Sequence, residues 1–246
     1  MKLIKNKIGS HVGVIISFVI FITFLVFLFV ILKPSLEVAE EKEATLNNIE
    51  SLFFEYLNSN LTTISLNIDN DVTLTGQNCL KFNSVESISA TGLEGNNLYV
   101  KNLANTNVGF YWQTSGSNLL TENSGQNKFF KIYASDEISS QQNTLSICQN
   151  IGVSDYSVGI VKTENGIFEK KILETMQFYK IDYSALRQAI GISSSEFDFD
   201  FVYNNGTIIS AGGVNHQTDI FAKEIPINYF NSSLNNNAGS IIIKTW

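Results

Sequence analysis

The side chains that could do chemistry in this chain are few, and two carboxylates form the best-spaced pair among them. Asp198 and Asp200 alternate with Phe197, Phe199 and Phe201. A strand here would place both carboxylates on one face and the three rings on the other. Such a pair could serve acid–base chemistry or supply half of a Ca²⁺ site. The solvated face of a half-buried strand explains the same pattern, and this is the interpretation we favour.

Histidine, the most frequent general acid or base, gives little support for an enzyme. His11 lies at the boundary of an apolar segment, and His216 stands alone in a loop. The sequence contains no G-x-S-x-G, H-E-x-x-H or C-x-x-C motif and no phosphate-binding glycine loop. We therefore predict a protein that is not an enzyme and needs no cofactor or metal. An anchored hydrolase is the least favoured alternative.

The chain has two cysteines, Cys79 and Cys148. Outside the cytoplasm an even pair most often forms a disulfide, and closing a loop of about 70 residues stabilises a fold by roughly 4 kcal/mol on the chain-entropy model. Two buried free thiols are the alternative. No second Cys or His stands near either cysteine, which argues against a metal or redox site.

Three N-x-S/T triplets are acceptors for glycosylation if the compartment has the machinery, at Asn60, Asn205 and Asn231. A chain this rich in Asn, Ser and Thr contains such triplets by chance. Their number is therefore no evidence that the protein is glycosylated.

The location of the protein depends on an uncharged apolar run from Val12 to Leu32. At about 1.5 Å per residue it reaches roughly 31 Å, the thickness of the hydrocarbon core of a bilayer. A helix buried in a soluble core would show a polar face. A cleaved secretory signal has a shorter apolar run followed by small residues, and the segment Lys33–Glu40 offers none at the required spacing. We predict a retained transmembrane helix over residues 10–34.

The charges on either side of this helix predict its orientation. Lysines alone precede it, whereas acids dominate after it, and the chain carries a net charge of −7. The positive-inside rule places residues 1–9, a basic leader, in the cytoplasm and residues 35–246 outside the cell. The lipid bilayer is thus a predicted partner. The acidic exported part argues against nucleic acid as a partner.

Residues 35–58 repeat apolar side chains at helical spacing, as in Leu46, Ile49, Phe53 and Tyr56. Pro34, just before them, marks a kink or a new helix start. We predict an amphipathic stalk helix whose apolar stripe packs on the protein's own head. Packing against neighbouring copies is the alternative.

The head, residues 60–246, is predicted to be β-rich. Short alternating segments separated by Asn and Gly predict a mainly antiparallel, sandwich-like unit, with one short helix over 183–190 and a hairpin around 204–206. The fold class is therefore α+β. Further strands are predicted at 63–68, 97–101, 108–113, 128–134, 144–148, 157–162, 168–172, 220–227 and 240–246, with a hairpin turn at 164–166.

The leader, which places Lys5 and Lys7 before Gly9 and Ser10 and runs straight into the apolar helix, resembles the class III signal of type IV pilin-like proteins, the archaeal kind included. The resemblance is limited to the N-terminal region. It implies cleavage between Gly9 and Ser10, a helix that anchors the subunit and later packs into a filament core, and pilin-like partners or self-association. Bacterial members carry Glu at the fifth mature position, where this chain has Val14. An uncleaved signal-anchor is the alternative.

Two functions follow from these predictions. The first is a single-pass, N-terminus-in surface protein, either a pilin-like structural subunit or an accessory protein. The second is an anchored module that binds a glycan or a protein partner through exposed aromatic residues such as Tyr111 and Trp112.

Overall fold

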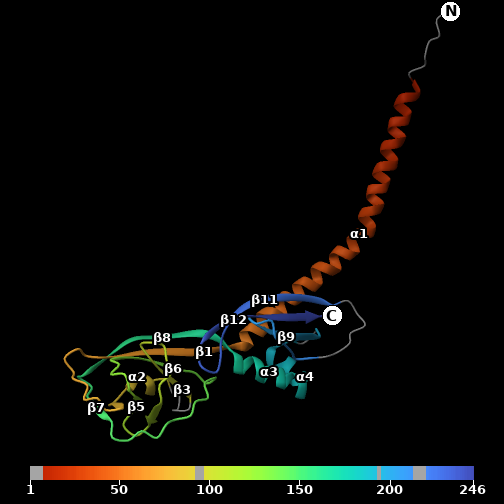
Figure 1. The fold of residues 1–246 in the computed structure, drawn as a ribbon. Helices are drawn as coiled ribbons and strands as arrows, with labels where there is room; N and C mark the ends of the chain where they lie inside the picture. The colour runs from red at the N-terminus through yellow and green to blue at the C-terminus, as the bar shows by residue number, and fades with distance from the viewer. Residues whose placement is uncertain (1–7, 92–96, 193–194, 213–219) are drawn as a thin grey trace, which may run out of the picture.

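The computed structural model describes residues 8–91, 97–192, 195–212 and 220–246, and no side chain is described for residues 8–12 and 34–40. The chain begins with one long helix and continues into an elongated β-rich head (Figure 1). The strands are mostly antiparallel, since only β11 with β8 and β2 with β7 pair in parallel. The predicted α+β class is confirmed.

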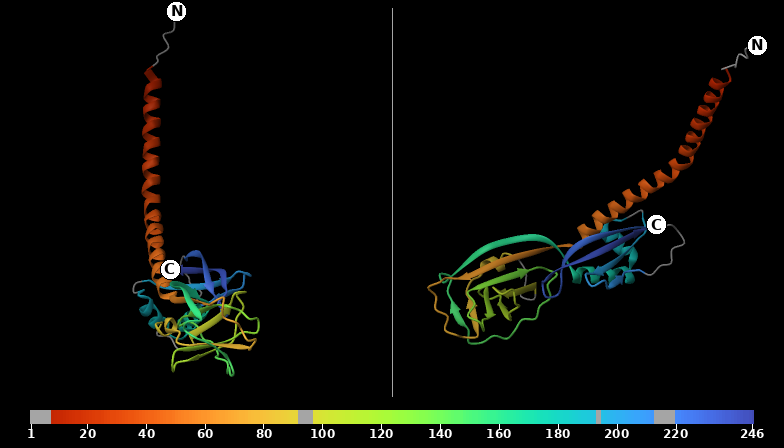
Figure 2. Two further views of the ribbon diagram at one scale, coloured as in Figure 1. Left: turned by 90° about the vertical axis from the view of Figure 1, so that its left-hand side faces the viewer. Right: turned by 45° about the horizontal axis from the view of Figure 1, so that its top comes forward.

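Helix α1 (Ile8–Leu57) is 50 residues long and contains both the predicted transmembrane helix and the predicted stalk. The apolar stretch Gly13–Lys33 has none of its residues buried, and its length and composition suit a membrane anchor or a signal sequence. The helix continues through the predicted boundary at Pro34 without a break, and it bends along its length (Figures 1 and 2). A proline lacks only one helical hydrogen bond, so a long helix can bend at that point and continue.

The last turns of α1 are packed into the head. Leu46, Ile49, Phe53 and Leu57 are buried in one core cluster, whereas Tyr56 is only partly buried at its edge. The predicted docking of the stalk on the protein's own head is therefore confirmed. The four buried side chains of this stripe are therefore not accessible to a neighbouring copy.

The head consists of two lobes that lie end to end (Figure 2). The proximal lobe contains residues 169–246 and packs on the end of α1. It contains α3 (Glu169–Ile181), α4 (Tyr183–Ile190), β9 (Phe197–Tyr203), β10 (Ile208–Ser210), β11 (Phe221–Phe230) and β12 (Asn236–Thr245). Its strands pair antiparallel in the order β10-β9-β12-β11, and their inner faces form one core with α1, α3 and α4.

The distal lobe contains residues 58–168 and lies farther from the apolar helix. Strands β1 (Asn58–Ile68), β3 (Leu98–Asn102), β6 (Phe129–Ala134) and β8 (Tyr156–Phe168) belong to the same sheet as the proximal strands. A second sheet has the order β4-β5-β2-β7, from β2 (Cys79–Phe82), β4 (Phe110–Gln113), β5 (Asn118–Glu122) and β7 (Gln149–Ile151). A short helix, α2 (Glu86–Ser89), completes the lobe, and one core draws on both sheets.

The distal lobe is an insertion between two helices of the proximal unit. Strand β1 follows α1 without a linker, and β8 leads directly into α3. The two parts of the large sheet are joined through only two parallel pairs, Tyr229 with Ile167 and Phe230 with Phe168. The junction between the lobes is therefore the place where two separate cores meet.

Several predicted elements are confirmed and others are wrong. Helix α4 has the predicted bounds, and the turn before β10 is present, with Gly206 at a positive φ of 81°. The strand predicted at 168–172 is instead the start of α3, because Ile172 and Met176 face the core at helical spacing. The strand predicted at 144–148 is irregular chain. The turn predicted at 164–166 lies inside β8, where β1 pairs with every one of these residues.

Candidate functional site

A groove opens at the junction of the two lobes and is the best candidate site in the described part of the chain. Its first section has a volume of about 350 Å³. Three segments far apart in sequence form its walls: the loop after β6, the first turns of α3, and the turn between β11 and β12. We call it the junction groove.

The floor of this first section is apolar. Phe168 and Phe230 lie with their ring centroids 5.5 Å apart, and Ile138 and Leu234 are buried beside them. Leu173 of α3 is partly exposed at the rim. These side chains are there because the strands β8 and β11 end at this point and bring their last aromatic residues together.

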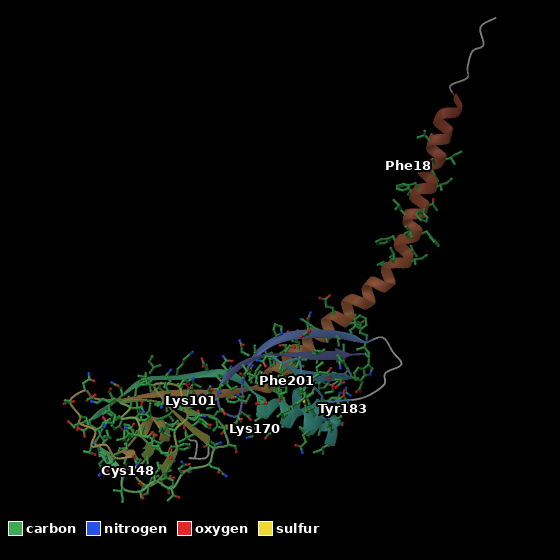
Figure 3. All side chains as sticks on the ribbon, in the orientation of Figure 1. Phe18, Lys101, Cys148, Lys170, Tyr183 and Phe201 are labelled. Atoms are coloured by element: carbon green, nitrogen blue, oxygen red, sulfur yellow. A yellow bond between two sulfur atoms is a disulfide. The ribbon has the colours of Figure 1, made fainter. Side chains whose placement is uncertain are left out.

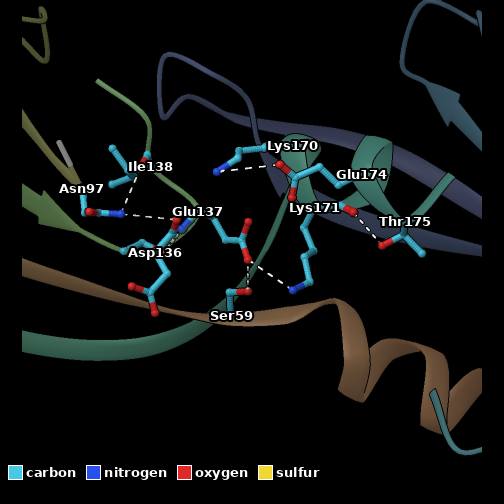
Figure 4. A network of polar contacts seen from close by, with 10 residues as sticks. Ser59, Asn97, Asp136, Glu137, Ile138, Lys170, Lys171, Glu174 and Thr175 are labelled. Carbon is cyan, nitrogen blue, oxygen red and sulfur yellow. Dashed lines mark hydrogen bonds and ion pairs between the residues drawn. The ribbon is translucent and has the colours of Figure 1, made fainter. Parts of the chain in front are cut away.

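The charged side chains around the floor are paired with one another (Figure 4). Lys170 lies 3.9 Å from Glu174 one helical turn later. On the opposite wall Glu137 lies 3.4 Å from Lys171 and accepts a hydrogen bond of 2.9 Å from the Ser59 hydroxyl. Three carboxylates, Glu137, Glu169 and Glu174, line this section with one lysine, Lys170, so the rim is acidic.

Glu169 begins α3 and accepts a hydrogen bond of 2.8 Å from the hydroxyl of Tyr203. Burial, followed by this hydrogen bond, raises the pKa of Tyr203 to about 12. At neutral pH the tyrosine therefore keeps its proton and donates a hydrogen bond to the carboxylate, which holds Glu169 in place at the groove.

A second section of about 390 Å³ adjoins the first and shares Ser139 and Ser232 with it. Its wall contains hydroxyl and amide side chains, among them Tyr99, Asn107 and Gln141, and no charged residue. The groove therefore changes along its length from an apolar floor to a neutral hydrogen-bonding surface.

Lys101 fixes the β11–β12 turn that forms one wall of the groove. The side chain is 1% exposed, and its ammonium donates hydrogen bonds to the carbonyl oxygen of Leu234 at 3.0 Å and to Oδ1 of Asn235 at 3.1 Å. It also lies 5.8 Å from the ring centroid of Tyr133. Burial, with a smaller effect of Lys131, lowers the pKa of Lys101.

This lowered pKa predicts a pH dependence of stability. Between the lowered value and 10.5, the ordinary pKa of lysine, the unfolded chain binds more protons at this position than the folded chain. Raising the pH through that window should therefore increase the free energy of unfolding of the wild type relative to Lys101→Met. The measurement is urea unfolding of both proteins from neutral pH to above 10.5. A wild type that loses stability relative to the variant would contradict the prediction, and Lys180→Met, at an exposed lysine of α3, is the control.

The carboxylates predicted to face solvent do not. Asp198 and Asp200 are buried, because β9 is flanked by β10 and β12 and the ammonium of Lys244 lies above its outer face. Lys244 Nζ is 2.5 Å from Asp200 and 3.9 Å from Asp198, which also accepts the backbone N–H of Gly212 at 2.9 Å. Asp200 Oδ1 has no hydrogen-bond partner among the described residues. The described part of the chain holds no group of three or more potential metal ligands.

The structure joins Cys79 and Cys148 in a disulfide, as predicted. Figure 3 shows Cys148 at the end of the head farthest from the apolar helix. Since 69 residues separate the two cysteines, the bond stabilises the distal lobe by about 4 kcal/mol on the chain-entropy model. It also fixes the end of the loop that supplies a wall of the groove.

The remaining predicted sites are scattered. Asn60 and Asn205 are exposed, whereas the Asn231 side chain is partly buried and accepts hydrogen bonds from the backbone N–H groups of Ser233 and Asn235. Gly9 and Ser10 lie in the first turn of α1, and their surroundings are outside the description. The side chain of His11 and the whole of His216 also lie outside the described residues.

Of the two aromatic residues predicted to be exposed, only Tyr111 is exposed. Tyr111 is 41% exposed, but Trp112 is 6% exposed and belongs to the distal core, because adjacent residues of β4 face opposite sides. Sequence reasoning missed the junction groove altogether. The only local signal was a pair of aromatic residues. Phe168 begins a predicted strand, and Phe230 lies three residues after the end of another.

Comparison of the chain with protein-family models, with curated proteins and with solved structures finds no match.

Proposed function

We propose that this protein is a single-pass, pilin-like surface subunit whose β-rich head is displayed outside the cell. The observation that carries the proposal is the division of α1. Its apolar stretch Gly13–Lys33 is exposed all round, whereas its last turns are buried in the head core. One continuous helix therefore supplies both an anchor and an attachment to the head.

The exposed stretch needs an apolar environment, because leaving a Leu, Ile or Phe side chain in water instead of burying it costs about 1.5–3 kcal/mol. A bilayer supplies that environment for a helix of this length. In a pilin-like subunit the same surface would later pack against the helices of other copies. In the membrane and in a filament alike, the last turns of α1 would stay packed on the head.

Two further observations support an exported head. The Cys79–Cys148 bond is of a kind that persists in oxidising compartments. The lysines before the apolar stretch and the acids after it fit an N-terminus on the cytoplasmic side. We also infer that the distal lobe is a sandwich, since its two sheets bury one common core.

The pilin-like part of the proposal is tested by the mature N-terminus. Intact-mass measurement of protein purified from its native membrane should give a chain that starts at Ser10, because the resemblance to class III signals implies cleavage after Gly9. Gly9→Leu should leave the chain uncleaved, since the bulky side chain replaces the small residue of the signal. Gly13→Leu is the matched control, because a Cβ at Gly13 meets no atom within 4 Å.

A wild-type chain that starts at Met1 would count against pilin-like processing and favour the simple signal-anchor. Equal cleavage of wild type and Gly9→Leu would show that another site is used. Val14 at the fifth mature position weakens the expectation of bacterial-type assembly rather than that of cleavage, so filament formation is a separate question for electron microscopy of the cell surface.

A further inference from the structure

We propose that the junction groove binds a neutral oligosaccharide. The inference is independent of how the N-terminus is processed, since it rests only on the head. It is carried by three features of the groove: the adjacency of its two sections, the chemistry of those sections, and the fixed position of the loop that lines both.

The two sections of the groove adjoin each other. They share Ser139 and Ser232, which lie on opposite walls, one in the loop after β6 and one in the β11–β12 turn. Each section has a volume near the lower end of the range of about 300–1,000 Å³ for ligand sites. A ligand that fills both sections must therefore be long relative to its width, as a short chain of sugar rings is.

The first section suits one face of a sugar ring. A pyranose presents C–H groups on its faces and hydroxyl groups around its edge. Phe230 and Leu173 offer an apolar surface for the face, and Glu174, Lys170 and Gln177 stand at the rim with acceptors and donors for hydroxyl groups. Because three carboxylates and only one lysine line this section, its rim disfavours an anionic ligand.

The polar, uncharged lining of the second section disfavours charged ligands and purely apolar ligands. Among the described residues that line it none is charged, so neither a phosphate nor a uronate finds a counter-charge from them. An apolar peptide or lipid chain would leave the amides and hydroxyls of the groove wall unpaired. Each such group that becomes buried costs about 1–3 kcal/mol. The hydroxyls of Ser139 and Ser232 and the amide of Gln141 have no hydrogen-bond partner within the described residues, so they are available to a ligand.

The loop after β6, which lines both sections, is held in place before any ligand arrives. Oε1 of Gln142 accepts the backbone N–H of Trp112 at 2.8 Å, and the backbone N–H of Asn143 donates to the carbonyl of Phe110 at 2.8 Å. Ile138 is buried at one end of this loop, and the disulfide closes the other end at Cys148. A pre-formed wall reduces the ordering cost of binding.

The experiment uses the full-length protein in nanodiscs free of glycolipid, because sugar-based detergents would compete for the groove. The probes are cellotetraose, maltotetraose and the N-acetylglucosamine tetramer as neutral chains, with tetragalacturonate as the acidic counterpart. Binding is followed by saturation-transfer NMR and titration calorimetry. At least one neutral chain should bind, and tetragalacturonate should bind more weakly.

Two variants locate the binding. Leu173→Arg fills the apolar section, and Gln141→Arg places a charge in the polar section. Each should weaken binding by at least about tenfold. Ile181→Arg is the matched control, since Ile181 lies at the other end of α3 and is 74% exposed. Thermal unfolding of each variant shows that the head is intact, and two variants in separate sections guard against the failure of one to fold.

Failure of all three neutral chains to bind would overturn the inference. Binding that survives both groove variants, or that is lost equally in Ile181→Arg, would overturn it as well, because the contact would then lie elsewhere. None of these results bears on the start of the mature chain, so this proposal and the pilin-like proposal fail separately.

Discussion

Replacing Phe53 by alanine is expected to lower the free energy of unfolding of the head by about 3–5 kcal/mol, the usual cost of removing a fully buried aromatic ring. Phe53 is 0% exposed, and its ring centroid lies 4.6 Å from that of Phe199 and 6.0 Å from that of Phe197. The substitution opens a cavity where α1 meets the sheet of the proximal lobe. A stability loss of this size is a large part of the total for a typical domain.

The measurement is thermal and urea unfolding of the full-length protein in detergent, followed by circular dichroism. Phe27→Ala is the matched control, because it removes the same ring from the exposed part of the same helix. This control should leave the unfolding midpoint of the head unchanged. Equal effects of the two substitutions would mean that the end of α1 does not pack on the head in solution.

Replacing Lys244 by methionine is expected to cost about 3–5 kcal/mol, because it leaves two buried carboxylates of like charge without their only cation among the described residues. Lys244 is the partner of both Asp198 and Asp200, and Asp200 has one oxygen that makes no hydrogen bond in the described structure. The remaining charges would repel each other across a surface that water barely reaches.

A double variant separates the loss of the cation from the loss of packing. Adding Asp200→Asn to Lys244→Met removes one of the two charges and should recover a large part of the lost stability. Lys223→Met on the neighbouring strand is the control. Its partner Glu50 and its own side chain are partly exposed, so a cost below about 1 kcal/mol is expected. If the double variant were no more stable than Lys244→Met alone, the charges would not be the cause.

The amino-acid sequence by itself determined the elements whose physics is local. The apolar run is long enough to span a bilayer whatever follows it, and the stripe that includes Phe53 repeats at the helical period. The bounds of helix α4 could be predicted to the residue because both of its ends carry local signals. The Asp182 side chain caps the first turn by accepting a hydrogen bond from the backbone N–H of Ala185, and Gly191 ends the helix with a φ of 89°. These signals depend on neighbours within a few residues.

Other features were decided only by the tertiary structure, because their causes lie far away in the chain. Asn165 and Gly166 look like a turn, yet they continue a strand because β1 pairs with them across about a hundred residues of sequence. Asp198 and Asp200 are buried because β9 lies between β10 and β12, and Lys244 on β12 is their cation.

The junction groove is the clearest case of this kind. Its walls come from three segments that meet only when the distal lobe is inserted between α1 and α3. No periodicity or motif within any one of those segments encodes the cavity, since its shape depends on how two separate cores come together. The anchor could therefore be read from the sequence, whereas the candidate binding site required the fold.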